Sequence, residues 1–89
     1  MNAPEAPAPL TSPLLHLHPN DNVLVAKTAL ALGQAIPELG VRMRAQVPAG
    51  HKIAARRIAE GEQVRKYDTV IGVATRDLEP GDYVHSHNL

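Results

Sequence analysis

The segment IAEGEQV, residues 58–64, places one glycine between apolar residues that lie three positions before it and three positions after it. The same arrangement recurs in VPAGHKI at residues 47–53 and LEPGDYV at residues 78–84, and more weakly in LALGQAI at residues 30–36. Successive glycines are 17, 11 and 20 residues apart, so this is a reused turn and not a solenoid repeat. Glycine accepts φ > 0 without steric cost, which predicts a turn between two short strands in each segment.

The runs between these turns are rich in β-forming residues. Apolar and polar residues alternate over residues 41–47, which predicts a half-buried strand. The apolar run at residues 70–74 is broken by Gly72, which indicates a bulge or a close approach of another segment. Residues 23–36 would also tolerate a helix, but the β-branched Val23 and Val25 and the turn at Gly33 favour strand, turn, strand. The prediction is a small mostly-β domain, a compact barrel or clip of short strands joined by glycine turns.

Composition bounds the size of this domain. Residues 1–13 contain four of the eight prolines, lack the pattern of a secretory signal, and are predicted to be a flexible tail. Residues 14–89 then form one domain of about 75 residues, a size at which the core is marginal. Cysteine, Phe and Trp are absent from the sequence. Such a domain often depends on a partner, and the lack of cysteine makes a cytoplasmic location the expectation.

Charge excludes some classes of partner. Nine basic and nine acidic residues balance, so no overall field would attract nucleic acid or an anionic membrane. No window approaches the roughly 20 apolar residues of a membrane span. We therefore expect neither nucleic acid nor a membrane as a partner.

Histidines are the main residues with chemical capability. His85 and His87 have the spacing that places two side chains on one face of a strand, where they could bind a divalent metal or exchange protons near pH 7. Two exposed histidines on a terminal strand are the alternative. His51 and Lys52 follow the turn at Gly50, and His18 precedes a polar turn. On spacing alone none of these signals is specific.

The order of several short motifs is more specific. HPNDNV at residues 18–23, GHKIA at 50–54, GEQVRKY at 61–67, IGVA at 71–74 and VHSHN at 84–88 resemble the SAF domain of the altronate and galactarate dehydratase family. This resemblance implies a β-clip fold. The family commonly has glycine after Lys-Tyr, where this chain has Asp68, and we expect a modest change in turn geometry because Asp tolerates φ > 0 better than most residues.

The resemblance also implies a reaction, the removal of water from a sugar acid such as altronate to give a 2-keto-3-deoxy acid. The chain would be the small subunit, or a detached N-terminal domain, of a dehydratase that acts with a large catalytic subunit, and it would be inactive alone. A divalent metal, Fe²⁺ or Mn²⁺, would be held mainly by the large subunit, with His85 and His87 as further candidate ligands.

Site residues follow from the same motifs. The resemblance implies catalytic roles for a group of five residues, His51, Lys52, His85, His87 and Asn88. It implies substrate binding by Lys66 and Tyr67, and a secondary, structural role for His18, Asp21 and Asn22. Two alternatives stay open: the small subunit of a sulfolactate sulfo-lyase, with sulfite as the leaving group, and a non-catalytic SAF ligand-binding module.

Overall fold

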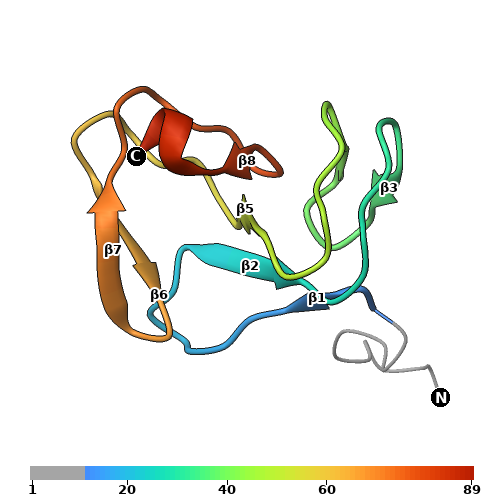
Figure 1. The fold of residues 1–89 in the computed structure, drawn as a ribbon, viewed down its shortest axis with the longest axis horizontal. Helices are drawn as coiled ribbons and strands as arrows, with labels where there is room; N and C mark the ends of the chain where they lie inside the picture. Colours follow the sequence, from blue (N-terminus) through green and yellow to red (C-terminus); the bar gives the residue numbers. More distant parts are fainter. Residues whose placement is uncertain (1–11) are drawn as a thin grey trace, which may run out of the picture.

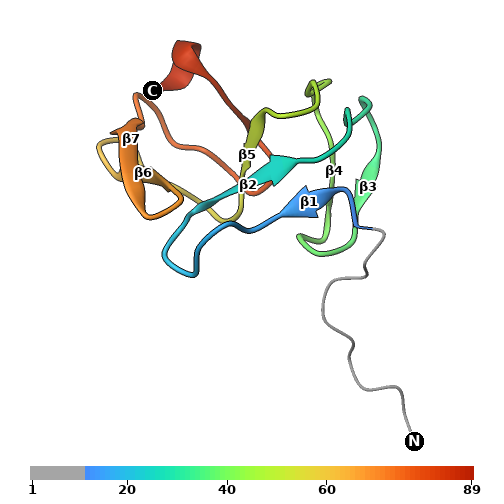
Figure 2. The ribbon, with the colours of Figure 1, turned by 60° about the horizontal axis from the view of Figure 1, so that its bottom comes forward.

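A four-stranded antiparallel sheet organises the computed structural model, which describes residues 12–89 (Figure 1). Its strand order is β1-β2-β5-β8, and these strands are Leu14–Leu15, Val23–Ala26, Lys52–Ala54 and Tyr83–Val84. Two hairpins extend from opposite ends of the sheet, as Figures 1 and 2 both show. They are β3–β4, Ala35–Ile36 with Val41–Arg42, and β6–β7, Gln63–Lys66 with Thr69–Val73. The predicted mostly-β clip of short strands is confirmed, and residues 1–11 of the predicted tail lie outside the described residues.

All four predicted glycine turns are present, with glycine φ values between +83° and +90°. Each turn glycine donates its N–H to a carbonyl of a neighbouring segment at 2.7 to 2.8 Å: Gly33 to Met43, Gly50 to Ala26, Gly61 to Ala74 and Gly81 to Ala54. The apolar residue that opens each turn forms a bridge with another turn, Leu30 with Val47 and Ile58 with Leu78. The turns therefore work in two pairs, one in each half of the chain.

The two halves have matching cores. One cluster of buried residues consists of Leu14, Ala26, Leu30, Ile36, Met43, Val47 and Ile53. The other consists of Val23, Ala54, Ile58, Val64, Ala74, Leu78 and Val84. Residues 26–36 correspond to residues 54–64, and residues 43–53 correspond to residues 74–84, with equivalent hydrogen bonds. Neither set of buried residues includes an aromatic residue, although the half-buried Tyr83 packs against the first cluster.

The sequence prediction succeeded for one ambiguous segment and failed for another. Residues 23–36 form strand β2, a turn at Leu32–Gly33 and strand β3, as expected. The continuous strand expected over residues 41–47 is wrong, because β4 ends at Arg42 and the chain bends at Arg44–Ala45. Val47 has to pair with Leu30, and the bend brings it there. Met43 and Val47 are buried, as the alternating pattern predicts, but Ala45 is exposed.

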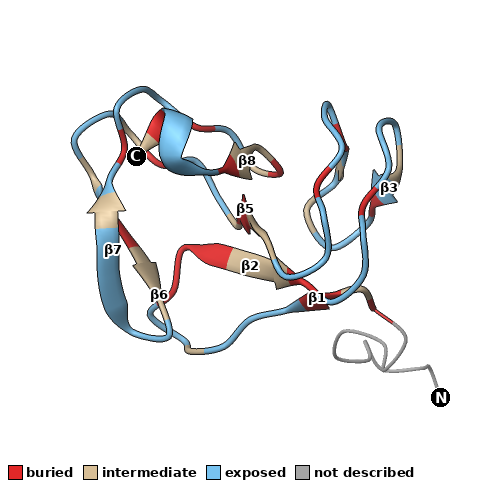
Figure 3. Cartoon of the chain, in the orientation of Figure 1, coloured by how far each residue is buried: buried red, intermediate tan, exposed pale blue. Residues whose placement is uncertain are grey.

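Gly72 marks both features that the sequence indicated. Val64 pairs with Gly72 but Arg65 pairs with Val70, so Ile71 is an extra residue in β7 and forms a bulge. A Cβ atom on Gly72 would lie 3.2 Å from the Cβ atom of Leu89, so the last residue packs directly on this strand. Most of β7 is nevertheless exposed to solvent (Figure 3). In residues 12–89 there is no helix long and apolar enough to cross a membrane.

Gly81 and Gly61 provide a matched test of the turn. A Cβ atom at Gly61 would meet nothing within 4 Å, whereas one at Gly81 would lie 2.9 Å from Cγ2 of Val41. We expect Gly61→Ala to lower the free energy of unfolding by about 1 kcal/mol, through left-handed backbone strain alone. Gly81→Ala should cost at least about 1 kcal/mol more, because the added methyl group overpacks the contact with Val41. Urea unfolding of both variants measures the difference, and equal losses would contradict the close packing at Gly81.

Candidate functional site

The C-terminus is folded onto the domain. β8 ends at Val84 and a 3₁₀ turn, η1, follows at Ser86–Asn88. The expectation that His85 and His87 lie on one face of a strand is therefore wrong. The buried Asn88 side chain explains the change: Oδ1 accepts the backbone N–H of His85 at 2.9 Å, and Nδ2 donates to the carbonyl of Tyr83 at 2.7 Å. These two bonds close the chain into a turn.

Two further contacts hold this end in place. The backbone N–H of Thr75 donates to the carbonyl of Asn88 at 3.1 Å, and Leu89 lies against Gly72 of β7. Asn88 is fully buried and both polar atoms of its side chain are used within the domain. The structure thus places Asn88 beneath the turn, where it sets the positions of the two histidines beside it.

Four rings gather beside this turn, and we call them the histidine cluster: His51, Tyr83, His85 and His87. The rings of His51 and His85 are stacked with centroids 5.7 Å apart, and those of His85 and His87 are also 5.7 Å apart. Tyr83 contacts all three histidines at centroid distances between 5.2 and 6.0 Å. Three predicted site histidines from two distant segments are therefore brought together.

Tyr83 was not singled out in the sequence, although it completes the cluster. Its hydroxyl oxygen lies 2.6 Å from Nδ1 of His51. A signal was available, because Tyr83 stands two residues after the turn glycine Gly81, as Lys52 stands two residues after Gly50. β5 and β8 are adjacent strands, with Ile53 opposite Tyr83, so these two turns had to lie side by side.

Lys52 of β5 and Lys66 of β6 lie near enough for their charges to interact. Lys52 follows His51 directly in the chain, and it is half-buried. Partial burial and the nearby charge of Lys66 both lower the pKa of Lys52 below its ordinary value. A lysine pair that is partly desolvated favours an anionic ligand, because a carboxylate would relieve the repulsion between the two ammonium groups.

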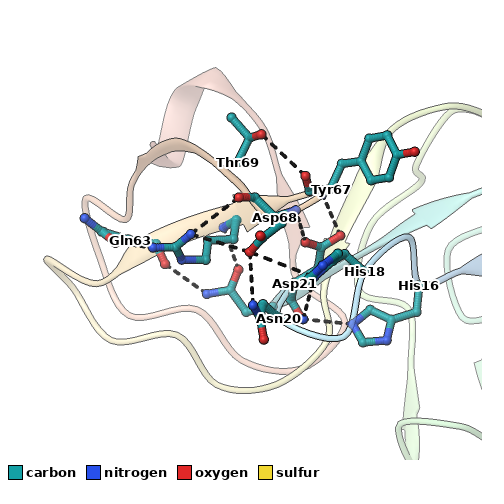
Figure 4. A network of polar contacts seen from close by, with 10 residues as sticks. His16, His18, Asn20, Asp21, Gln63, Tyr67, Asp68 and Thr69 are labelled. Atoms are coloured by element: carbon teal, nitrogen blue, oxygen red, sulfur yellow. Dashed lines mark hydrogen bonds and ion pairs between the residues drawn. The ribbon is translucent and has the colours of Figure 1, made fainter.

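Tyr67 occupies a different place from the cluster. It forms the tip of the β6–β7 hairpin together with Asp68, and its side chain is 72% exposed. Both residues have positive φ, 55° and 58°, as a two-residue type I′ hairpin turn requires. The expected tolerance of Asp68 for this conformation is confirmed. In Figure 4 the Tyr67 ring points away from the polar network around it.

Asp21 holds that hairpin turn from below (Figure 4). Its two carboxylate oxygens accept the backbone N–H groups of Tyr67 and Asp68, each at 2.7 Å. Burial of the carboxylate opposes its ionisation, but these two hydrogen bonds outweigh the effect of burial and hold the pKa of Asp21 below its ordinary value. Asp21 is thus an ionised anchor for a strained turn.

The neighbours of Asp21 extend this anchor. The buried side chain of Asn22 pairs with strand β6, donating to the carbonyl of Gln63 and accepting the N–H of Arg65, both at 2.9 Å. His18 lies 3.9 Å from the Asp68 carboxylate, where Asn20 also donates at 3.1 Å. The segment of residues 18–22 therefore clamps the β6–β7 hairpin, the element that carries Lys66.

The described residues do not form a complete metal site by themselves. No group of three or more His, Asp or Glu side chains within residues 12–89 has the arrangement needed to hold an ion. His85 and His87 lie close enough for their rings to contact, but they would supply two ligands at most. An open groove of about 500 Å³ lies elsewhere, lined by Asn20, Asn22, Arg56, Glu62, Gln63 and Arg65. None of the cluster residues lines that groove.

Comparison with known proteins gives a consistent family. The model of the altronate/galactarate dehydratase SAF domain matches residues 12–89. The altronate dehydratase of Escherichia coli (strain K12) is 41% identical over 76 residues, and that of Bacillus subtilis (strain 168) is 34% identical over 76 residues. Each alignment covers 83% of this chain but 15% of the relative, so the chain spans a small part of the length of these relatives.

A second class of relative aligns over a shorter stretch. The (2R)-sulfolactate sulfo-lyase subunit alpha of Chromohalobacter salexigens is 44% identical over 43 residues, which cover 48% of this chain and 46% of that protein. The subunit of the same name from Paracoccus pantotrophus is 42% identical over 45 residues, which cover 51% of this chain and 67% of that protein.

The role of the Asn88 side chain can be tested by replacing it with alanine. Asn88→Ala would leave the N–H of His85 and the carbonyl of Tyr83 without their partner, and we expect a loss of about 1–3 kcal/mol in the free energy of unfolding. Amide exchange at residues 84–89 should accelerate as the turn loosens. Ser86→Ala is the control, because Ser86 is exposed and its hydroxyl hydrogen-bonds, among residues 12–89, to the neighbouring His85 ring at 3.2 Å. Unchanged exchange in Asn88→Ala would contradict the anchoring role.

Asp21 gives a prediction for acid stability. Its pKa is lower in the folded state than in the unfolded state, so its contribution is fully present above about pH 4 and is lost as pH falls toward the folded pKa. We expect Asp21→Asn to lower the urea midpoint at pH 7. The difference in midpoint between the two proteins should shrink below pH 4. A difference that stays constant from pH 7 to pH 2 would show that the ionised carboxylate is not the anchor.

Proposed function

Because this chain belongs to the family of the altronate/galactarate dehydratase SAF domain, we propose that it works with a large catalytic subunit or domain in the dehydration of a sugar acid such as altronate. The product would be a 2-keto-3-deoxy acid. The observation that carries the proposal is the histidine cluster, in which His51 of the GHK motif meets His85 and His87 of the VHSHN motif. The homologous proteins named as dehydratases support the class of reaction.

The reaction defines what the cluster would have to do. A base removes the proton on the carbon next to the carboxylate, the electron pair is held as an enediolate, and the β-hydroxyl leaves with a proton as water. The resulting enol then takes up a proton at carbon to give the keto acid. Developing charge on the enediolate needs preorganised hydrogen-bond donors, and departure of the hydroxyl group needs an acid. Imidazole and ammonium groups supply both.

Charge placement suits the substrate. Lys52 and Lys66 would meet the substrate carboxylate, since their mutual repulsion is relieved by an anion between them. The histidine rings would face the carbons that react. The alignments cover 15% of the length of each altronate dehydratase, which supports a division of labour. In this proposal the domain contributes one wall of the site, and the partner contributes the remainder.

A metal, Fe²⁺ or Mn²⁺, would be held mainly by the partner in this proposal. A bound divalent ion would supply charge to stabilise the enediolate. His85 and His87 can add two imidazoles at most, as the absence of a three-residue site within residues 12–89 indicates. The residues of this chain would then bind and orient the substrate and move protons. We also propose a cytoplasmic location, as the absence of cysteine suggests.

A sulfo-lyase is the second candidate. The alignment with two sulfolactate sulfo-lyase alpha subunits favours it. The alignments cover 46% and 67% of the length of these two proteins, compared with 15% of each altronate dehydratase. Elimination of sulfite uses the same first step, removal of the proton next to the carboxylate. It needs less help from an acid, because sulfite is a better leaving group than hydroxide. A non-catalytic SAF module, which would bind a ligand without reacting, is the third candidate.

Reconstitution with a large subunit of the family tests the catalytic proposal. We expect no turnover by the chain alone, formation of 2-keto-3-deoxy acid from altronate by the pair, and a loss of about 100-fold or more in kcat/KM for His85→Ala or His87→Ala. Leu32→Ala is the matched control, because Leu32 is 65% exposed and lies on a turn outside the cluster. Full activity of both histidine variants would favour the non-catalytic module.

The leaving group separates the two enzymatic candidates. The same reconstituted pair is given altronate or sulfolactate, and released keto acid and sulfite are measured. Keto acid from altronate without sulfite from sulfolactate supports the dehydratase. Release of sulfite alone would replace it with the sulfo-lyase.

A further inference from the structure

Three of the four glycine turns share a closing hydrogen bond, and the turn at Gly50 lacks it. In three turns the side chain that follows glycine accepts the backbone N–H of the residue two positions before glycine. The pairs are Gln34 with Ala31 at 2.9 Å, Glu62 with Ala59 at 3.0 Å and Asp82 with Glu79 at 2.8 Å. Each of these three turns thus uses a side-chain oxygen at that position to satisfy its own backbone.

The turn at Gly50 is built differently. The residue two positions before glycine is Pro48, which has no N–H to satisfy. The residue after glycine is His51, and its ring nitrogen Nδ1 lies 2.6 Å from the hydroxyl of Tyr83. The backbone bond of the turn, from the N–H of His51 to the carbonyl of Pro48, is kept at 3.2 Å. Because Pro48 has no N–H to satisfy, the side chain of His51 is not needed to close the turn.

The contact with Tyr83 bears on which nitrogen of His51 carries a proton. A tyrosine hydroxyl carries one hydrogen and can donate one hydrogen bond. Its single donor needs an acceptor, and among the described residues the acceptor within hydrogen-bond distance is Nδ1 of His51. When the hydroxyl donates to Nδ1 of neutral His51, the lone pair lies on Nδ1 and the proton on Nε2. In protonated His51 both nitrogens carry protons, so Nε2 is a donor in either state.

The other nitrogen is available for a ligand. Nε2 of His51 makes no hydrogen bond with residues 12–89. The ring is half-buried, and no buried side-chain nitrogen or oxygen in that range lacks a partner, so Nε2 is open to solvent. The stacked ring of His85 fixes the face of the imidazole, at a centroid distance of 5.7 Å. Nδ1 of His51 is thus hydrogen-bonded within the domain, and Nε2 is open to a ligand.

We propose that Tyr83 is a positioning residue that fixes His51 as a hydrogen-bond donor through Nε2. His51 would donate a hydrogen bond to an oxygen of the substrate, either that of the developing enediolate or that of the departing hydroxyl. It would not remove the proton from carbon. This role rests on the proposed function, but the hydrogen bond and the tautomer do not. Removal of the carbon proton then belongs to another residue of this chain or of the partner.

Nitrogen-15 NMR of the isolated chain tests the hydrogen bond without any enzymatic activity. We expect neutral His51 to show the Nε2–H tautomer, and Tyr83→Phe to shift the His51 ring nitrogens while the aromatic ring stays in place. Tyr67→Phe is the matched control for this spectrum, because it removes the other phenol of the chain at an exposed hairpin tip. An Nδ1–H tautomer in the native protein, or an unchanged His51 spectrum in Tyr83→Phe, would overturn the proposal.

Activity of the reconstituted enzyme then tests the assignment of His51 as a donor. Glutamine keeps an N–H donor and cannot act as a base, so His51→Gln should retain at least about tenfold more kcat than His51→Ala. Tyr83→Phe should lower kcat by about tenfold with little change in KM. Equal, complete loss of activity in His51→Gln and His51→Ala, with both proteins folded, would instead assign His51 as the base. If no large subunit gives activity, the proposed function fails while the spectrum still decides the tautomer.

Discussion

The backbone N–H of each turn glycine is the contact on which the rest of this structure depends. With glycine in the left-handed region, the N–H faces the carbonyl of a neighbouring segment, and four such bonds connect the strands into pairs. The apolar residues three positions either side of glycine are then carried into the same small cluster. Because the device is used twice in each half, two aliphatic cores of seven residues replace one large core. A chain without Phe or Trp can fold in this way, since no single cluster has a large volume to fill.

Neither of the two tyrosines is among the buried residues of the two cores. Tyr67 is at an exposed hairpin tip, and Tyr83 is half-buried beside three histidines. Residues of this type usually contribute the largest buried areas of a domain. Here Tyr83 packs its ring at the edge of one core and directs its hydroxyl to His51, so its polar atom has a partner. The side chain therefore joins the aliphatic frame to the histidine cluster.

Much of the frame could be predicted from the sequence because its signals are local. Glycine spacing predicts all four turns, and β-branched residues predict strands β2 and β7. Pairing between distant turns is not local, so the bend at Arg44–Ala45 and the exposure of β7 were not predictable from alternation alone. At the C-terminus the spacing of His85 and His87 was interpreted as a strand. The Asn88 side chain closes a 3₁₀ turn instead, and a single buried amide carries no periodic signal. The sequence motifs did indicate His51, but not the tyrosine that holds it.

Comparison of the two halves indicates where the fold has been adapted. Ile36 of β3 and Met43, which follows β4, are seven residues apart, whereas the equivalent Val64 of β6 and Ala74, which follows β7, are ten residues apart. The longer hairpin carries Lys66 and needs the Asp21 carboxylate to hold its tip. The turn at Gly50 departs from the other three at Pro48 and His51 in the same way. Both departures give up a simple turn that the frame already contains, and each places a cationic or ionisable side chain where a ligand could reach it. The other three turns close with a side-chain oxygen at the position of His51, so a glycine turn of this kind does not itself require a histidine there.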